Sequence, residues 1–268
     1  MKKLLILLII LFTLASNAVW SADYNKGWEA YNSGNYTTAL SEWRPLAEQG
    51  DSDAQYNLGY LYADGLGVIQ NYKTALKWFT LAAEQGDDGA QFAVGMSYDD
   101  GLGVPENDKI ALKWYTLAAE QGNASAQFTL GKMYFHGEGA PQDYQTSVKW
   151  ITLAAEQGHV KSQNNLGQFY RNGQGVIQDY KTAVKWYTLA AEQGHAIAQN
   201  NLGQMYENGW GVLQDNIYAH MWGNIAASSG NENGAELRDR VANKMTTADI
   251  SKAQNLAREC VAKNYKGC

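Results

Sequence analysis

The sequence is poor in proline, cysteine and histidine. It holds only 3 prolines, 2 cysteines and 4 histidines in 268 residues. So few prolines argue against a long disordered linker. So few histidines and cysteines leave little from which to build a metal site or an acid–base pair. We therefore expect no catalytic residue, no metal and no cofactor.

Positive charge is scarce as well. The chain has 21 Lys and Arg residues against 27 Asp and Glu residues, a formal net charge of -6 at pH 7. Nucleic acids and anionic membrane surfaces attract proteins that carry clustered positive charge. We therefore expect no nucleic-acid partner, and we attribute the negative charge to solubility.

A long apolar run occurs only once, from Leu4 to Leu14. It follows two lysines and precedes small residues that end at Ala18, a pattern typical of a secretory signal peptide. The run is shorter than the roughly 20 residues of a membrane-spanning helix. We predict a signal peptide at residues 1–18, with ends at 21 or 22 as alternatives, and no transmembrane segment in the mature chain. The mature protein is then exported, to the periplasm rather than to the medium.

Both cysteines, Cys260 and Cys268, lie in the C-terminal tail. In an exported chain such a pair predicts a structural disulfide, which would contribute about 2–3 kcal/mol of stability. The alternative is a metal or redox pair, which needs further ligands or the tighter Cys-x-x-Cys spacing.

The chain is rich in one periodic pattern, in which glycines, tryptophans and Leu-Gly pairs each recur every 36 residues. We call the same position in successive copies a register. The glycines are Gly50, Gly86, Gly122, Gly158, Gly194 and Gly230, the tryptophans are Trp78, Trp114, Trp150, Trp186 and Trp222, and the pairs begin at Leu58, Val94, Leu130, Leu166 and Leu202. A period of this length indicates stacked units, none of which buries its apolar face alone.

Each copy has the pattern of a helix-turn-helix. In the first, apolar residues at helical spacing surround Leu58, the turn Gly65-Leu66-Gly67 interrupts them, and a second helical pattern runs from Ala75 to Ala83. Short side chains that can accept hydrogen bonds predict N-caps of the second helices at Asn71, Asn107, Asp143, Asp179 and Asp215. The predicted units are residues 24–50, 51–86, 87–122, 123–158, 159–194 and 195–230, closed by capping helices and a tail at 231–268.

Another glycine register lies inside the predicted first helices, where glycine costs about 1 kcal/mol relative to alanine. Its members are Gly59, Gly95, Gly131, Gly167 and Gly203. We expect the two helices of each unit to approach closely at this glycine, with the tryptophan and tyrosine of the same copy packed around the contact.

The copies resemble a Sel1-like repeat, a relative of the tetratricopeptide repeat. The resemblance lies in Ala54-Gln55-Tyr56-Asn57-Leu58-Gly59, in Asp64-Gly65-Leu66-Gly67-Val68 and in the run from Ala75 to Gly86, and it recurs five times over residues 51–230. Residues 24–50 resemble a tetratricopeptide-type unit, and the segment after Met245 resembles a closing helix. The resemblance implies an all-α, right-handed α-solenoid of stacked helix-turn-helix repeats. It also implies a non-enzymatic role in protein–protein interaction, commonly in envelope, signalling or host-contact settings, which would include the assembly or regulation of an envelope complex.

Exported cysteine-rich relatives suggest an alternative function, the hydrolysis of β-lactams or peptidoglycan-like substrates. Serine β-lactamases carry Ser-x-x-Lys, Ser-Asp-Asn and Lys-Thr-Gly signatures, and none of them occurs here. His159 and His195 stand at predicted helix starts, where capping is the expected role. Asp99-Asp100 is the one conspicuous carboxylate pair outside the repeat pattern, and we expect it to be solvated.

The binding surface is expected on the first helices, which line the concave face in tetratricopeptide stacks. Outward positions there vary between copies while the core positions do not. The predicted partner-binding residues are Tyr56, Tyr60, Phe92, Met96, Phe128, Lys132, Phe135, Lys161, Asn164, Gln168, Arg171, Asn200 and Gln204. The early members are mostly large and apolar and the later ones are polar or basic. This division fits a protein or extended peptide whose acidic or C-terminal group lies near Lys161 and Arg171. The alternative is that some of the aromatic side chains pack between neighbouring repeats.

Overall fold

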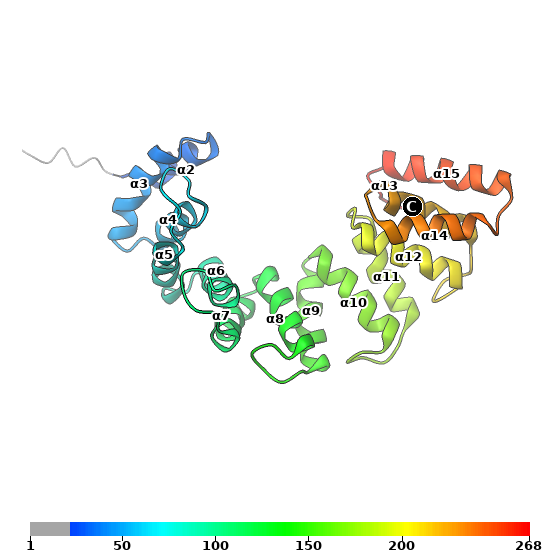
Figure 1. Ribbon diagram of the computed structural model, residues 1–268, viewed down its shortest axis with the longest axis horizontal. Coiled ribbons are helices and arrows are strands. Elements are labelled where there is room, and N and C mark those ends of the chain that lie inside the picture. Colours follow the sequence, from blue (N-terminus) through cyan, green and yellow to red (C-terminus); the bar gives the residue numbers. More distant parts are fainter. Residues whose placement is uncertain (1–21) are drawn as a thin grey trace, which may run out of the picture. The chain divides into compact units, whose positions relative to one another are not determined.

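The computed structural model describes residues 22–268, and within this range every regular element is a helix (Figure 1). The helices are α2 (Tyr24–Asn32), α3 (Tyr36–Glu48), α4 (Ser52–Asp64), α5 (Tyr72–Glu84), α6 (Asp88–Asp99), α7 (Asp108–Glu120), α8 (Ala124–His136), α9 (Tyr144–Glu156), α10 (Val160–Asn172), α11 (Tyr180–Ala191), α12 (Ala196–Asn208), α13 (Asn216–Ser228), α14 (Glu232–Ala242) and α15 (Thr247–Ala262). The predicted all-α class and the helix-turn-helix units are confirmed.

The predicted signal peptide at residues 1–18, with its alternative end at 21, lies outside the described residues. Between residues 22 and 268, no helix combines the length and the apolar character that crossing a membrane requires. The chain divides into two compact units, one ending at Ala90 and one running from Gln91 to Cys268. Each unit is a stack of consecutive helix pairs, with α2 to α5 in the first and α7 to α15 in the second.

The helix ends confirm the predicted caps. The side chain of Asn71 accepts a hydrogen bond from the backbone N–H of Thr74 at 2.9 Å, and the other four members of the register cap in the same way: Asn107, Asp143, Asp179 and Asp215. Glycine in the inner turn is required at Gly175, because its φ is +70° and an added Cβ would meet the backbone carbonyl of Tyr144.

The glycines inside the first helices do mark a close approach of the two helices, but their neighbour differs from the prediction. An added Cβ at Gly59 would lie 2.5 Å from the ring of Phe79, and one at Gly167 would lie 2.6 Å from the ring of Tyr187. In the first four repeats the residue over the glycine is therefore the one that follows the repeated tryptophan. Trp78, Trp150 and Trp186 are half-buried at the edges of the core clusters instead. In the fifth repeat, Trp222 itself is buried beside Gly203, as predicted.

A ladder of glutamine side chains joins consecutive helix pairs. Gln55 Nε2 donates to the backbone carbonyl of Ala47 at 3.0 Å, and Gln55 Oε1 accepts from Gln85 Nε2 at 2.8 Å. The same two bonds recur at Gln127 and at Gln163. In the fifth repeat Ser229 stands in the register of Gln85, and Gln199 Oε1 is buried without a hydrogen-bond partner. Since buried amides are normally satisfied on both sides, this break marks the end of the regular stack.

The C-terminal segment closes that end. Leu237 of α14 is fully buried against Gly203. Glu207, only 8% exposed, accepts hydrogen bonds from Arg240 at 2.7 Å and Lys244 at 2.9 Å. These two cations hold the pKa of the Glu207 carboxyl below its ordinary value, the Arg240 bond being the main cause.

Beyond α15 the tail folds back onto the stack. Cys260 and Cys268 form the predicted disulfide, with 5.5 Å between their Cα atoms. The backbone N–H of Gly267 donates to Glu192 at 3.0 Å, and the ring of Tyr265 lies over Gly194. The disulfide therefore closes a short tail that contacts residues about 70 positions earlier in the chain.

Candidate binding surface

Two of the predicted residues form an aromatic pair in the first unit. The rings of Tyr56 and Tyr60, one helical turn apart on α4, meet edge to face with centroids 4.8 Å apart. Both also contact the ring of Phe79. Burial raises the pKa of the Tyr56 hydroxyl, so this group stays neutral and bonded to its neighbour. The pair is partly packing and partly surface, since Tyr60 is 37% exposed.

Phe92 and Met96 begin the predicted surface of the second unit. Phe92 packs on Tyr115, with ring centroids 5.4 Å apart, and Met96 is 38% exposed. The Tyr115 hydroxyl donates to Asp99 at 3.1 Å. Burial raises the pKa of the Asp99 carboxyl, and the neighbouring Asp100 raises it further. Asp99 is thus half-buried and bonded within its own repeat, whereas Asp100 is exposed, so the expectation of a solvated pair is wrong for Asp99 only.

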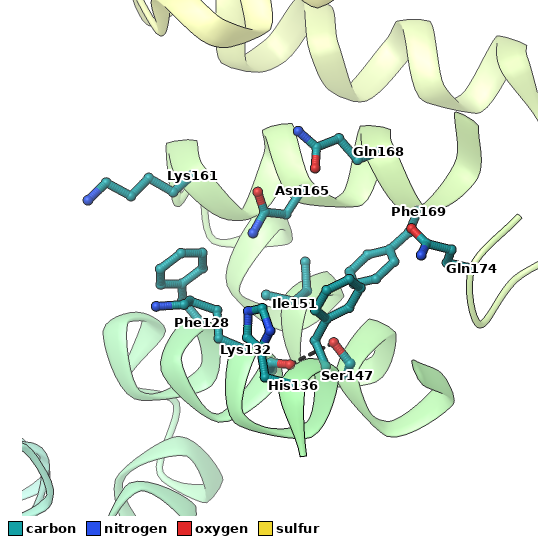
Figure 2. Close-up of a pocket in the computed structure, with 12 residues that line it drawn as sticks. Phe128, Lys132, His136, Ser147, Ile151, Lys161, Asn165, Gln168, Phe169 and Gln174 are labelled. Carbon is teal, nitrogen blue, oxygen red and sulfur yellow. Dashed lines mark hydrogen bonds between the residues drawn. The ribbon is translucent and has the colours of Figure 1, made fainter. Parts of the chain in front are cut away.

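The second unit has a cavity of about 380 Å³ between α8, α9 and α10 (Figure 2). It is lined by Phe128, Gly131, Lys132, Phe135, His136, Ser147, Ile151, Lys161, Asn165, Gln168, Phe169 and Gln174. Five of these were predicted to bind a partner: Phe128, Lys132, Phe135, Lys161 and Gln168. The fold brings them together from two successive first helices.

The apolar part of the cavity lies along α9 and the ends of α8 and α10. Ile151 lies against Gly131 at its base, and Phe135 meets Phe169 edge to face at 5.6 Å. Ser147 is fully buried, and its hydroxyl donates to the Gly131 carbonyl at 2.6 Å. These side chains form an apolar floor and one apolar wall.

The rim of the cavity is polar and basic. Lys132 projects from α8, and Lys161, Asn165 and Gln168 project from α10 (Figure 2). Among the described residues that line the cavity, none carries a carboxylate. The rim therefore favours an acidic group.

At one edge the cavity adjoins a histidine cap. The ring of Phe128 lies 4.8 Å from that of His159, whose Nδ1 accepts from the backbone N–H of Ser162. Burial lowers the pKa of the His159 imidazole, and the charge of Lys161 lowers it further. Capping, the expected role of His159, is confirmed, and the neutral ring serves it.

The structure corrects the orientation expected for two of the predicted residues. Asn164 and Asn200 are each 4% exposed and do not face outward. Asn164 Oδ1 accepts from Asn201 Nδ2 at 3.0 Å, a bond between successive first helices. A polar side chain at an outward-looking position is buried here because the next repeat covers it.

Arg171 and Gln204 lie outside the cavity. The Arg171 guanidinium stacks 5.1 Å from the ring of Trp210, which also stacks on the ring of Tyr180. Gln204 is half-buried on α12. Lys161 lines the cavity and Arg171 does not. An acidic group of a partner bound in the cavity would therefore lie near Lys161 and not near Arg171.

Several lining residues were not predicted from the sequence: His136, Ser147, Ile151, Asn165, Phe169 and Gln174. One signal could have revealed the site. The register over the first-helix glycine holds Phe79, Tyr115 and Tyr187, but Ile151 in the third repeat. In the fifth repeat Gly223 holds this register, and Leu237 from α14 fills the space instead. In the third repeat the absence of an aromatic ring leaves the space that forms the cavity.

The repeats match a known family. The Sel1 repeat model matches residues 52–87, 89–123, 124–159, 160–195 and 196–231. The chain belongs to the Sel1 repeat family. Sel1 repeat proteins are generally protein-interaction scaffolds, and their fold is typically non-enzymatic.

Solved Sel1 structures agree with the fold. A Sel1 repeat protein from Oxalobacter formigenes is 31% identical over 92% of this chain and 98% of its own, with a TM-score of 0.77. The protein c5321, a protective antigen of uropathogenic Escherichia coli strains, is 28% identical over 90% of this chain and 62% of its own, with a TM-score of 0.58. Among curated proteins, no sequence match was found.

Proposed function

We propose that this protein is an exported, non-enzymatic scaffold that binds another protein or an extended peptide through the cavity between α8, α9 and α10. The observation that carries the proposal is that five side chains predicted to bind a partner line a single cavity. Pockets that combine an apolar floor with a few polar groups are the usual form of a binding site. Assembly or regulation of an envelope complex is the setting that we propose for this interaction.

Export is supported by two features. The N-terminal sequence has the pattern of a signal peptide, and the Cys260–Cys268 disulfide is compatible with an oxidising compartment. We propose the periplasm as the location of the mature protein.

A non-enzymatic role is supported by the one serine in the cavity. Hydrolysis of a β-lactam by a serine enzyme needs an activated hydroxyl whose proton passes to an adjacent base. The Ser147 hydroxyl instead donates to the backbone carbonyl of Gly131. A carbonyl oxygen does not act as a base of that kind, so this serine serves packing.

The test is photo-crosslinking in the native bacterium, with the full-length chain including its N-terminal segment. A benzophenone amino acid replaces Phe128 at the cavity or, as a control, Ile177, which is 91% exposed. We expect a discrete adduct from position 128 and none from 177. Replacing Lys132 and Lys161 with alanine should weaken the adduct most at low salt, where charges are least screened.

Two results would contradict the proposal. Equal adducts from positions 128 and 177 would show that the cavity is not the binding site, and no adduct from either would refute the scaffold role. Export has a separate readout, because the intact mass of the mature protein from the periplasmic fraction should correspond to a chain cut after Ala18, or at residue 21 or 22. A full-length mass in the cytoplasmic fraction would refute export alone.

A further inference from the structure

The slot over the first-helix glycine is filled by an aromatic ring in most repeats. Phe79 covers Gly59, and Tyr115 and Tyr187 cover the equivalent glycines of their repeats, with ring carbons 2.5 to 2.6 Å from an added Cβ. In the third repeat Ile151 occupies this place. Isoleucine has no ring to extend across the slot, so the space beyond it stays open as the cavity.

The fifth repeat shows how the chain itself fills a slot that has lost its ring. Gly223 stands in the register of Tyr187 and supplies no side chain. Leu237, from α14, takes the place of the ring, with its Cδ2 atom 2.6 Å from an added Cβ on Gly203. It is fully buried there.

Charge accompanies this apolar anchor. Three and seven residues after Leu237, Arg240 and Lys244 bond to the carboxylate of Glu207 on α12. The segment that fills this slot thus combines one large apolar side chain with positive charges that pair with the negative charge of Glu207 beside the slot. Such paired features give both binding energy and specificity.

The slot of the third repeat has the same apolar base and the opposite rim charge. Lys132 and Lys161 stand at its edge, and no lining residue among those described is acidic. We propose that this slot receives one leucine, phenylalanine or similarly large apolar side chain from another protein, in a segment that carries carboxylates on either side of that residue. This inference rests on the proposed function and specifies the chemistry of its partner.

The slot can be closed by a substitution that the chain already uses elsewhere. Ile151→Tyr places a tyrosine over Gly131, as Tyr187 stands over Gly167. It should therefore fold, with a melting temperature no lower than that of the wild type. Ile177→Tyr, which adds the same ring at a position that is 91% exposed and outside the cavity, is the matched control.

The probes are three short fluorescein-labelled peptides, read by fluorescence anisotropy. The first has a central leucine between aspartates, the second a central alanine between aspartates, and the third a central leucine between lysines. We expect the first peptide to bind the wild type and Ile177→Tyr. The second should bind about 10- to 100-fold more weakly, from the loss of a buried leucine side chain. The third should not bind, and Ile151→Tyr should bind none of them.

A charge-reversal pair tests the rim. Lys132→Glu with Lys161→Glu should prefer the lysine-flanked peptide over the aspartate-flanked one. The control, Lys113→Glu with Lys181→Glu, has the same net charge on exposed second-helix positions and should keep the wild-type preference. An unchanged preference in the first pair would overturn the assignment of the rim.

The inference is overturned if no peptide binds the wild type, or if Ile151→Tyr binds the first peptide as well as the wild type does. The scaffold role is judged separately, by the adduct at position 128. An adduct with native protein that forms at an undiminished level in Ile151→Tyr would retain the scaffold and refute the slot. Absence of any adduct would refute the scaffold itself.

Discussion

Replacing the first-helix glycines with alanine should destabilise the protein by an amount that depends on what covers each glycine. The informative comparison is Gly167→Ala against Gly131→Ala. Both glycines stand at the same position of a helix, α10 and α8 respectively, so the helix propensity gained is the same, about 1 kcal/mol in favour of alanine. Any difference between the two variants therefore comes from the atoms that face each glycine.

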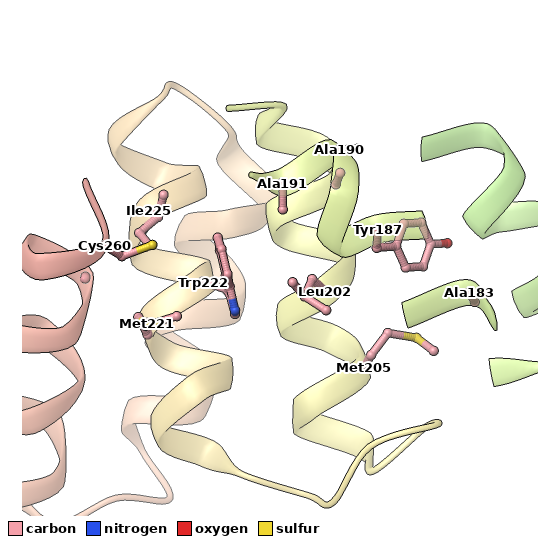
Figure 3. Packing of buried hydrophobic residues seen from close by; sticks show 12 residues of the cluster. Ala183, Tyr187, Ala190, Ala191, Leu202, Met205, Met221, Trp222, Ile225 and Cys260 are labelled. Atoms are coloured by element: carbon pink, nitrogen blue, oxygen red, sulfur yellow. The ribbon is translucent and has the colours of Figure 1, made fainter. Parts of the chain in front are cut away.

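At Gly167 the new methyl group would lie 2.6 Å from two ring carbons of Tyr187. That ring is fully buried in the cluster that also holds Leu202 and Met205 (Figure 3), so it has no free space to move into. Overpacking of this kind costs about 1–3 kcal/mol, and after the propensity gain the free energy of unfolding should fall by roughly 0–2 kcal/mol.

At Gly131 the neighbours are Cγ1 and Cδ1 of Ile151, at 2.6 and 2.8 Å, and the backbone oxygen of Ser147 at 3.2 Å. Ile151 borders the open cavity, so its end can rotate into that space. We expect the free energy of unfolding of Gly131→Ala to be about 1–2 kcal/mol higher than that of Gly167→Ala.

The measurement is urea unfolding followed by circular dichroism, with the m-value checked for each variant, since a changed m-value would signal a loss of two-state behaviour. Equal stability of the two variants, or a Gly167→Ala protein more stable than the wild type, would refute this account of the glycine register. Repeat proteins unfold partly repeat by repeat, so hydrogen exchange of α10 and α11 provides a local readout of the same effect.

Two further predictions concern pH and the tail. Burial holds the pKa of His159 and His195 below the ordinary 6.5, so the unfolded chain takes up these protons first and stability should fall as the pH drops through 6.5 toward the lower folded values. Asparagine is the cap in the same register elsewhere, so His159→Asn with His195→Asn should flatten that fall in thermal melts; an unchanged pH profile would contradict it. Reducing the Cys260–Cys268 disulfide, or replacing both cysteines with serine, should lower the free energy of unfolding by about 2–3 kcal/mol and speed hydrogen exchange in residues 263–268. Mass spectrometry that found two free thiols in the exported protein would refute the native disulfide.

Much of the fold follows from features that act locally or recur. The N-cap at Asn71 needs only a backbone N–H three residues away, and a left-handed glycine such as Gly86 ends a helix wherever it stands. The disulfide could also be predicted from the sequence, because the two cysteines have no other cysteine to pair with among the described residues. Because the same helix ends recur every 36 residues, a helix end that is ambiguous in one copy can be predicted from the other copies.

The candidate site was predicted only in part. Phe128 and Lys161 were identified because outward positions vary among copies, and both line the cavity. The same criterion predicts that the Asn164 side chain faces outward, although it is buried. Whether the next repeat buries such a side chain depends on how that repeat packs. The pattern within one repeat does not specify this packing.

What the sequence by itself determined is the repeat, the helix pairs within it and most helix ends, because these depend on residues close together in the chain. The tertiary structure alone decided which side chain covers each first-helix glycine and what is left when that side chain is small. In the sequence Ile151 is one apolar residue among many. Only the structure places it over Gly131, where the lack of an aromatic ring leaves a cavity. Leu237 likewise becomes the filler of an empty slot only because α14 folds back onto α12. The space left between two packed helices depends on the volumes of the side chains that face each other. Those side chains come from different helices, so the sequence of one helix does not determine that space.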